Sequence, residues 1–189
     1  MRVDSTKCTG CGRCHDLCTM SCISFVRNDD SRVVSSIDED ECVDCGVCER
    51  SGVCGLRALY MPPTEWPRTV RGAFSNPLAE HKETKVPGRG TEEMKTNDVT
   101  GRFKRGYAGM SIELGRPGVG ARLRNAGIIA SRLHQMGIRL EPKNPLTSLL
   151  VPDTYECLDS VSKEKVLSAI LEFIVPVSQV ADVIEMIRD

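Results

Sequence analysis

Apolar and polar positions follow two clear periods between residues 106 and 189. A period of two, as at Ala108, Met110 and Ile112, predicts half-buried strands, and a period of three to four predicts helices with one apolar face. Gly137 follows the longest helical run, where the end of a helix is expected. The predicted elements are a strand over residues 107–114, a helix over 121–136, a strand that begins at Ile138, a strand over 167–175 and a last helix capped by Ser178.

This order, β-α-β-β-α, predicts an α+β fold of the ferredoxin-like split βαβ type without its final strand. In a complete sandwich the fourth strand lies beside the first, so one edge of the 107–114 strand lacks its usual neighbour. Because an uncovered apolar edge invites pairing with another chain, we expect a second copy of the chain or another subunit to cover it. The fold itself is compatible with many functions.

The first 60 residues have short patterns and a very high density of cysteine. Residues 23–26 and 32–35 flank a turn-forming stretch and predict a small β-hairpin. A unit of this size buries too little apolar surface to fold alone, so groups bound by its cysteines must stabilise it. Nine of the ten cysteines lie here, at Cys8, Cys11, Cys14, Cys18, Cys22, Cys42, Cys45, Cys48 and Cys54, and Cys157 is the other one.

Residues 61–105 show neither period and contain many prolines and glycines. They predict an extended, irregular arm, because a structureless stretch of this length is uncommon within a compact domain. Two interpretations stay open: a mobile tether, or a segment ordered against a neighbouring domain or a partner. The predicted organisation is a cysteine-rich domain over residues 1–60, the arm over 61–105 and an α/β sandwich domain over 106–189.

Composition and charge exclude several classes of function. The net charge is −1 and aromatic residues make up 4% of the chain, which argues against a nucleic-acid-binding surface. No apolar run reaches the roughly 18 residues of a membrane span, and residues 1–7 lack the apolar stretch of a secretion signal. We therefore expect a cytoplasmic protein without membrane contact. In a reducing cytosol, crowded cysteines indicate metal binding rather than disulfides.

The cysteine spacing indicates which metal group is bound. The run Cys-x2-Cys-x2-Cys occurs at residues 8–14 and again at 42–48, and each run is followed by a fourth cysteine. Residues 1 to about 60 thereby resemble the bacterial-type ferredoxins with two [4Fe–4S] clusters, in which the fourth cysteine of each run ligates the other cluster. The resemblance implies that Cys8, Cys11, Cys14 and Cys54 bind one cluster, and that Cys42, Cys45, Cys48 and Cys18 bind the other.

The sequence departs from the ferredoxin pattern at two points. The second run continues as Cys48-x5-Cys54 where the family usually has x3, so the chain must bulge over residues 49–53. The proline that commonly follows the fourth cysteine is replaced by Thr19 and by Gly55. The alternatives are one degraded cluster or zinc, although zinc sites typically use two Cys-x2-Cys pairs separated by a longer stretch.

Four further features of the sequence each allow two interpretations. Cys22 is either a small buried apolar residue or a spare ligand or redox thiol. His15 either hydrogen-bonds a cysteine sulfur or is a solvated loop histidine. The acidic residues 38–41, with Asp44, either lower the reduction potential of the second cluster or form a solvated acidic turn. The glycines of residues 115–120 are either a phosphate-binding loop or an ordinary strand-to-helix connection.

No catalytic constellation and no flavin or nicotinamide site can be recognised in the sequence. We therefore expect electron transfer through two [4Fe–4S] clusters, as the small, non-catalytic subunit of a larger oxidoreductase complex or the partner of another redox protein. Free ferredoxins need neither a long arm nor a second domain. One alternative is a redox-linked regulatory or small-molecule-sensing protein whose C-terminal domain resembles the ACT type. A third is sulfur transfer or cluster delivery through Cys22.

Overall fold

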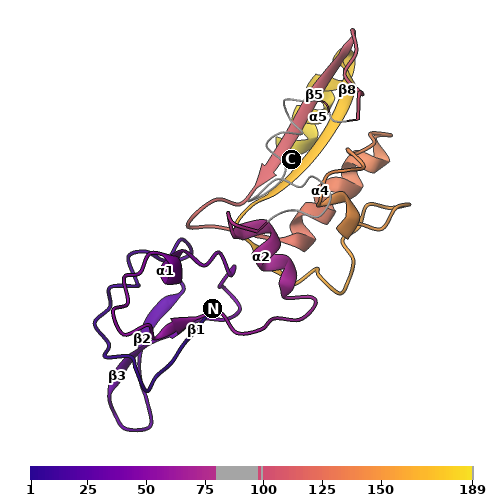
Figure 1. The fold of residues 1–189 in the computed structure, drawn as a ribbon. Helices are drawn as coiled ribbons and strands as arrows, with labels where there is room; N and C mark the ends of the chain where they lie inside the picture. Colours follow the sequence, from indigo (N-terminus) through magenta and orange to yellow (C-terminus); the bar gives the residue numbers. More distant parts are fainter. Residues whose placement is uncertain (80–97, 99, 189) are drawn as a thin grey trace.

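The computed structural model describes residues 1–79, 98 and 100–188 and has an α+β architecture of small sheets and short helices. Figure 1 shows the cysteine-rich part at one end, the C-terminal part at the other and helix α2 between them. The elements of the first part are β1 (Arg2–Val3), β2 (Ile23–Arg27), β3 (Val33–Ile37), α1 (Val47–Arg50) and β4 (Leu59–Tyr60). They are followed by α2 (Thr69–Ser75), β5 (Tyr107–Leu114), β6 (Ala121–Arg122), α4 (Leu123–Gln135), β7 (Lys165–Val166), β8 (Ala169–Pro176) and α5 (Val180–Arg188), with 3-10 turns at Thr147–Leu149 and Val177–Gln179.

The predicted hairpin of the cysteine-rich part is confirmed. β2 and β3 pair antiparallel over their full length, from Ile23 opposite Ile37 to Arg27 opposite Val33. β1 pairs antiparallel with β4 and so brings the two ends of this part together. The small core between these sheets contains Met1, Val43 and Leu59 together with buried cysteines. The cysteine sulfurs therefore form part of the packing that holds this part together.

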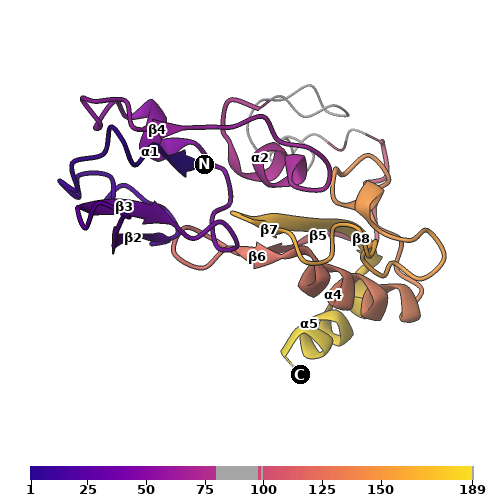
Figure 2. The same cartoon turned by 90° about the horizontal axis from the view of Figure 1, so that it is seen from below.

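The C-terminal part is built on a long antiparallel pair, β5 and β8, which are strands predicted by the alternating pattern. Figure 2 shows α4 and α5 on one face of this layer and α2 on the other. The predicted long helix forms as α4, and Gly137 ends it with a positive φ of 75°. Leu123, Ala126, Ala130 and Leu133 share the buried face of α4, which matches the expected period of three to four.

The strand expected from Ile138 is wrong. Leu140 forms only an isolated antiparallel bridge with Phe173 of β8. Pro142 and Pro145 follow closely, and because proline has no N–H group to donate, a ladder cannot extend past them. The last helix begins at Val180, and Ser178 lies within the 3-10 turn that precedes it rather than at a cap.

The expected irregular arm is wrong at α2. Thr69–Ser75 forms a helix between Pro67 and Pro77, and its Val70 and Phe74 side chains are buried in the core of the C-terminal part. Two apolar residues four positions apart are enough for one helical turn to bury its face, although they make a weak sequence signal. Most of the remaining arm, residues 80–97 and 99, lies outside the described residues.

Among the described residues, none of the helices is long and apolar enough to cross a bilayer. The ladder of β5 in the same residues is with β8, on one edge of the strand. Coverage of the second edge of β5 by another chain stays a prediction.

Candidate metal centres

The first predicted ligand set surrounds one cavity. Cys8, Cys11, Cys14 and Cys54 all line a cavity of about 470 Å³ in the cysteine-rich part. Three of them come from the loop after β1, and Cys54 comes from the segment between α1 and β4, forty residues after Cys14. The structure thus brings together the four cysteines that the ferredoxin resemblance assigns to one cluster.

The two extra residues before Cys54 are accommodated by local backbone structure. Val47–Arg50 forms the single helical turn α1, and Gly52 follows with a positive φ of 66°, a conformation that glycine adopts without strain. The expected bulge is therefore one helical turn and a left-handed glycine. The chain then turns so that the Ala58 N–H donates to Cys54 Sγ at 3.2 Å.

Backbone donors surround the Cys8 sulfur. The Ser35 N–H on β3 donates to Cys8 Sγ at 3.3 Å, and the Gly10 N–H donates to the same sulfur at 3.4 Å. Gly10 has a positive φ of 67°, and a Cβ atom there would lie 2.4 Å from the Val33 carbonyl oxygen. This position therefore requires glycine. Hydrogen bonds to sulfur are one of the means by which proteins tune iron–sulfur groups.

The second predicted set is also gathered, in a more buried position. Cys42 and Cys48 are buried, and Cys18 and Cys45 pack against the same small core. Burial raises the pKa of the Cys48 thiol to about 12, and the charges of neighbouring cysteines, chiefly Cys45 and Cys42, add to this effect. The thiolate of Cys48 is therefore disfavoured unless a bound positive charge, such as that of a metal group, offsets its burial and its neighbours.

Cys22 lies within this second set. Its sulfur is 3.4 Å from Cys18 Sγ, and its hydrogen bonds to Cys18 and Cys42 raise its own pKa. The hydrogen bond from Cys22 lowers the pKa of Cys18 to about 5, and a similar bond lowers the pKa of Cys42 to about 7. Cys22 is thus a buried thiol in contact with two of the predicted ligands, and its backbone N–H also donates to Cys18 Sγ.

His15 takes a position that neither sequence interpretation describes. Its Nε2 is 3.1 Å from Ser35 Oγ, and its ring lies 4.2 Å from the Phe25 ring between centroids. Ser35 Oγ in turn lies 3.6 Å from Cys14 Sγ. The histidine therefore orients the serine hydroxyl next to a cysteine sulfur without contacting the sulfur itself.

Asp44 is buried and paired, so the solvated acidic turn is wrong for this residue. Arg68, which immediately precedes α2, donates to its two carboxylate oxygens at 2.8 and 3.0 Å, and the Met1 amino group donates at 2.5 Å. Burial opposes ionisation of Asp44, but the hydrogen bonds from Arg68 and Met1 outweigh it, so the pKa lies below its usual range. The negative charge beside the second set is compensated by neighbouring cations.

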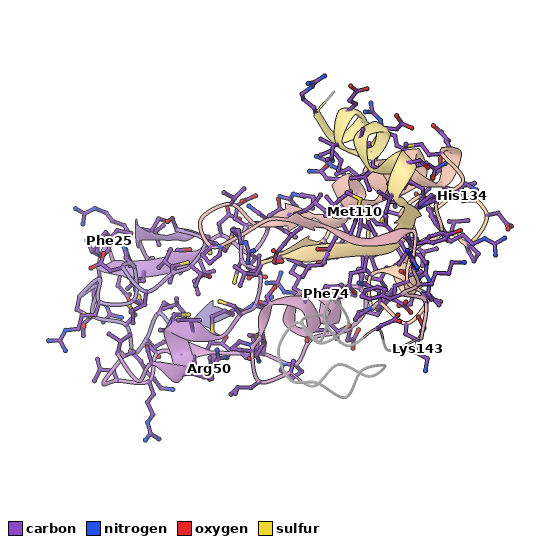
Figure 3. The ribbon with its side chains drawn as sticks, turned by 90° about the horizontal axis from the view of Figure 1, so that it is seen from above. Phe25, Arg50, Phe74, Met110, His134 and Lys143 are labelled. Atoms are coloured by element: carbon purple, nitrogen blue, oxygen red, sulfur yellow. The ribbon has the colours of Figure 1, made fainter. Side chains whose placement is uncertain are left out.

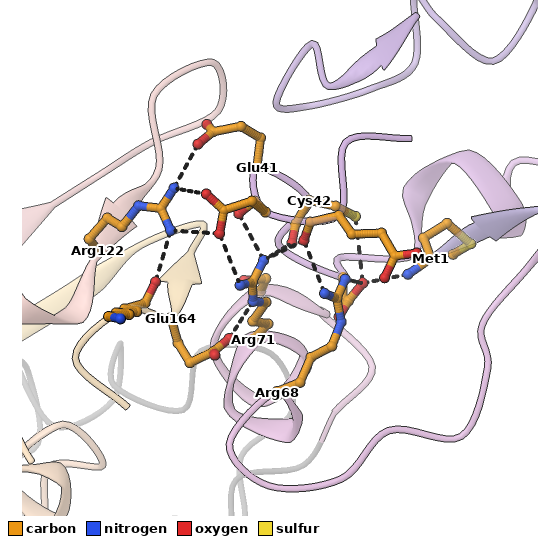
Figure 4. Close-up of polar contacts among 12 residues, drawn as sticks. Met1, Glu41, Cys42, Arg68, Arg71, Arg122 and Glu164 are labelled. Atoms are coloured by element: carbon orange, nitrogen blue, oxygen red, sulfur yellow. Dashed lines mark hydrogen bonds and ion pairs between the residues drawn. The ribbon is translucent and has the colours of Figure 1, made fainter. Parts of the chain in front are cut away.

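Arginines from outside the cysteine-rich part bind the rest of the acidic loop (Figure 4). Arg71 of α2 donates to the carbonyl oxygens of Glu39, Asp40 and Cys42 at 2.8 to 2.9 Å and forms an ion pair with Glu164. A second arginine acts from the C-terminal part: Arg122 Nη2 contacts Asp40 at 2.7 Å and Glu41 at 2.8 Å. The hydrogen bond to Arg122 lowers the pKa of Asp40. Sequence reasoning missed these arginines as parts of the site. For Arg71 the signal was the charge complementarity between the acidic loop and the basic segment after it, and for Arg122 there was no local signal.

The glycine loop at residues 115–120 packs against the cysteine-rich part. The Gly118 N–H donates to the Thr19 carbonyl oxygen at 2.5 Å, and a Cβ atom on Gly120 would lie 2.9 Å from the end of the Met20 side chain. The Thr19 hydroxyl in turn lies 3.3 Å from Cys45 Sγ. The loop connects β5 to β6 and contacts a segment next to the second set, which agrees with a structural connection.

A small cavity of about 70 Å³ lies beside β5 and β8 in the C-terminal part. Two of its lining residues, Arg102 and Glu141, form an ion pair at 3.3 Å. Residues next to the cavity bind the lining carboxylates as well: Thr100 donates to Glu141 at 2.6 Å, and Asn144 donates to Glu172 at 2.5 Å. The contacts of Thr100 and Arg102 hold residues 100–102 against the C-terminal part. They do not favour the alternative of a small-molecule sensor.

A single metal ion and a cubane cluster require different arrangements of cysteine sulfurs. Within the described residues, no three or more His, Cys, Asp or Glu side chains converge as ligands of a single metal ion. A single zinc ion needs its sulfur ligands about 2.3 Å from one point. In a cubane cluster each thiolate binds a different iron, so the ligands surround a wider space. The four cysteines surround a cavity, which is the arrangement that a cubane cluster needs. Backbone N–H groups that donate to two of their sulfurs are also compatible with such a cluster.

Comparisons with known proteins give no family assignment. No protein-family model, no curated protein and no solved structure matches this chain.

Proposed function

We propose that this protein transfers electrons through two [4Fe–4S] clusters, one bound by Cys8, Cys11, Cys14 and Cys54 and the other by Cys42, Cys45, Cys48 and Cys18. The observation that carries the proposal is the cavity around which the first three cysteines meet the distant Cys54. This is the cross-connection that the ferredoxin spacing implies. When bound, such clusters supply reversible one-electron transfer at a low reduction potential.

The surrounding residues have the roles that such a group needs. Backbone N–H groups of Ser35, Gly10 and Ala58 donate to cysteine sulfurs of the first set. Around the second set, Arg68 and Arg71 hold the loop that contains Cys42 and offset its carboxylates. These contacts orient ligand sulfurs and reduce the repulsion that accompanies additional negative charge.

The C-terminal part supports a role within a larger assembly. It packs against the second ligand set through α2 and the 115–120 loop and adds no recognisable catalytic group of its own. We infer a non-catalytic electron-transfer subunit that works with a larger redox subunit or another redox protein in the cytoplasm. Anaerobic purification tests this part of the proposal. The expected result is a stable complex with such a subunit, and an isolated chain that shows full electron-transfer activity contradicts it.

Reductive titration tests electron transfer itself. Anaerobically purified protein should take up about two electrons per chain from dithionite, one for each cluster, with loss of visible absorbance and a low-temperature EPR signal of reduced [4Fe–4S] clusters. Oxidation should restore the starting spectrum. A chain that accepts no electrons under these conditions contradicts the proposed function.

A further inference from the structure

The two predicted cluster sites differ in how much of the protein covers them. Cys42 and Cys48 are each 8% exposed, and their loop lies under α2 through hydrogen bonds from Arg71 to Cys42 and from Arg68 to Asp44. The 115–120 loop covers the neighbouring Thr19. The second set therefore faces the interior of the molecule, between the cysteine-rich part and the C-terminal part.

The first set is less covered, although its Cys14 is as buried as Cys42 and Cys48. Cys11 is exposed, and the cavity that it shares with Cys8, Cys14 and Cys54 opens to solvent. Figure 3 shows Phe25, whose ring lies over the loop of this set, at the opposite end of the molecule from His134 and Lys143. The end of the molecule that exposes the first set is thus free of the C-terminal part.

The mouth of this cavity has a definite chemistry. Lys7 and Arg13 line it, and its lining contains no carboxylate, although Asp4 forms an ion pair with Lys7 at 3.0 Å. Leu56 lines the cavity with 54% of its surface exposed, and Phe25, 53% exposed, packs against Gly12, which lies between Cys11 and Arg13. Cations around an exposed apolar centre form a surface that attracts a negatively charged partner and then excludes water from the contact.

We propose that this mouth, formed by Lys7, Cys11, Arg13, Phe25 and Leu56, is the docking surface for a redox protein with carboxylates around its cofactor. This inference rests on the proposed function and adds to it the site of exchange and the charge of the partner. One electron leaves the reduced protein at the first set and reduces the partner's one-electron cofactor. The second set is covered, so its electrons reach the partner through the first set.

Electron transfer to acceptors of opposite charge tests the proposal. The rate at which dithionite-reduced protein is oxidised is measured with anionic hexacyanoferrate(III) and with cationic hexaamminecobalt(III). The same measurement is made with two protein acceptors, an acidic flavodoxin and a basic cytochrome c. Arg13→Glu should slow oxidation by the anionic acceptors several-fold and leave the cationic ones unchanged or faster, and the difference should shrink at about 0.5 M salt. Arg13→Gln should give an intermediate effect.

The matched control is Lys143→Glu, an exposed charge reversal at the opposite end of the molecule. It should leave all rates as in the unmodified protein. Equal effects of Arg13→Glu and Lys143→Glu, or none from Arg13→Glu, would overturn the proposal.

A spectroscopic readout separates this proposal from the proposed function. The anionic chelate dysprosium–EDTA should speed EPR relaxation of one reduced cluster more than the other, and Arg13→Glu should weaken that effect. If the protein contains clusters but both relax equally, the docking surface is wrong and electron transfer stands. If no reduced cluster can be detected at all, the proposed function itself fails.

Discussion

Arg71 Nη1 donates a hydrogen bond to the carbonyl oxygen of Cys42 at 2.8 Å, while its Nε forms an ion pair with Glu164. One buried guanidinium thereby joins the loop of the second ligand set to the C-terminal part. Its side chain is 6% exposed, so water has little access to the groups that Arg71 binds and cannot readily replace its hydrogen bonds. Arg71 therefore fixes the position of the cysteine run as well as the contact between the two parts.

Replacing Arg71 should weaken both features. Arg71→Leu removes the Arg71 donor from the Glu164 carboxylate and from the carbonyl groups of Asp40 and Cys42, whereas the Glu39 carbonyl keeps its hydrogen bond from Arg68. Loss of one member of a buried ion pair costs about 3–5 kcal/mol. We expect lower thermal stability and loss of iron from the second set before the first, measured by iron content and EPR. Arg124→Leu, at an exposed position on α4, is the control and should change neither. Retention of all iron by Arg71→Leu contradicts this role.

Cysteine substitutions test the assignment of the ligands. Cys11→Ser should remove or degrade one cluster and destabilise the cysteine-rich part, because metal binding and folding are coupled in such units. Cys22→Ala should keep the full iron content, because Cys22 contacts Cys18 but belongs to neither predicted set. Loss of about four irons from Cys22→Ala would make it a ligand, and full iron content in Cys11→Ser would remove Cys11 from the set.

Two helical glycines should respond in opposite directions to replacement by alanine. A Cβ atom on Gly127 of α4 would lie 2.5 Å from the backbone nitrogen of Cys157, and such overpacking costs about 1–3 kcal/mol. Gly72 of α2 has open space at the same position, so Gly72→Ala should stabilise the protein by about 0.5–1 kcal/mol through helix propensity. Thermal denaturation measures both, and a stabilised Gly127→Ala protein contradicts the close packing.

Cys157 should be an unreactive thiol. Burial, with a smaller effect from the charge of Asp159, raises its pKa to about 11. Because only the thiolate is nucleophilic, alkylation of Cys157 by iodoacetamide at about pH 8 should be on the order of a hundredfold slower than that of an ordinary thiol with a pKa near 8.5. The rate should rise about tenfold per pH unit until the pKa is reached. Mass spectrometry of the peptide measures it, and a rate equal to that of a model thiol contradicts the burial.

Periodic segments could be predicted from the sequence, and short or interrupted ones could not. The strand at residues 107–114 and the helix that ends at Gly137 follow from patterns that span several turns or pleats. α2 depends on the burial of only Val70 and Phe74, a signal too short to separate from a proline-rich arm. Leu140 keeps one bridge of the expected strand because nearby prolines end the ladder.

The candidate site was predictable to the extent that spacing encodes it. The spacing of the cysteines predicts the eight ligands, and the structure places Cys54 around the same cavity as the first run. The partners of the acidic loop were not predictable, because Arg122 is 82 positions from Asp40 and nothing local links them. The same holds for His15, whose hydrogen bond to Ser35 depends on where β3 lies. Such contacts depend on tertiary packing rather than on local pattern.

Metal and sulfide analysis of anaerobically purified protein tests the central claim most directly. Two clusters require about eight irons and about eight acid-labile sulfides per chain, and the account predicts both, with little zinc. A preparation that contains zinc and no sulfide would contradict it.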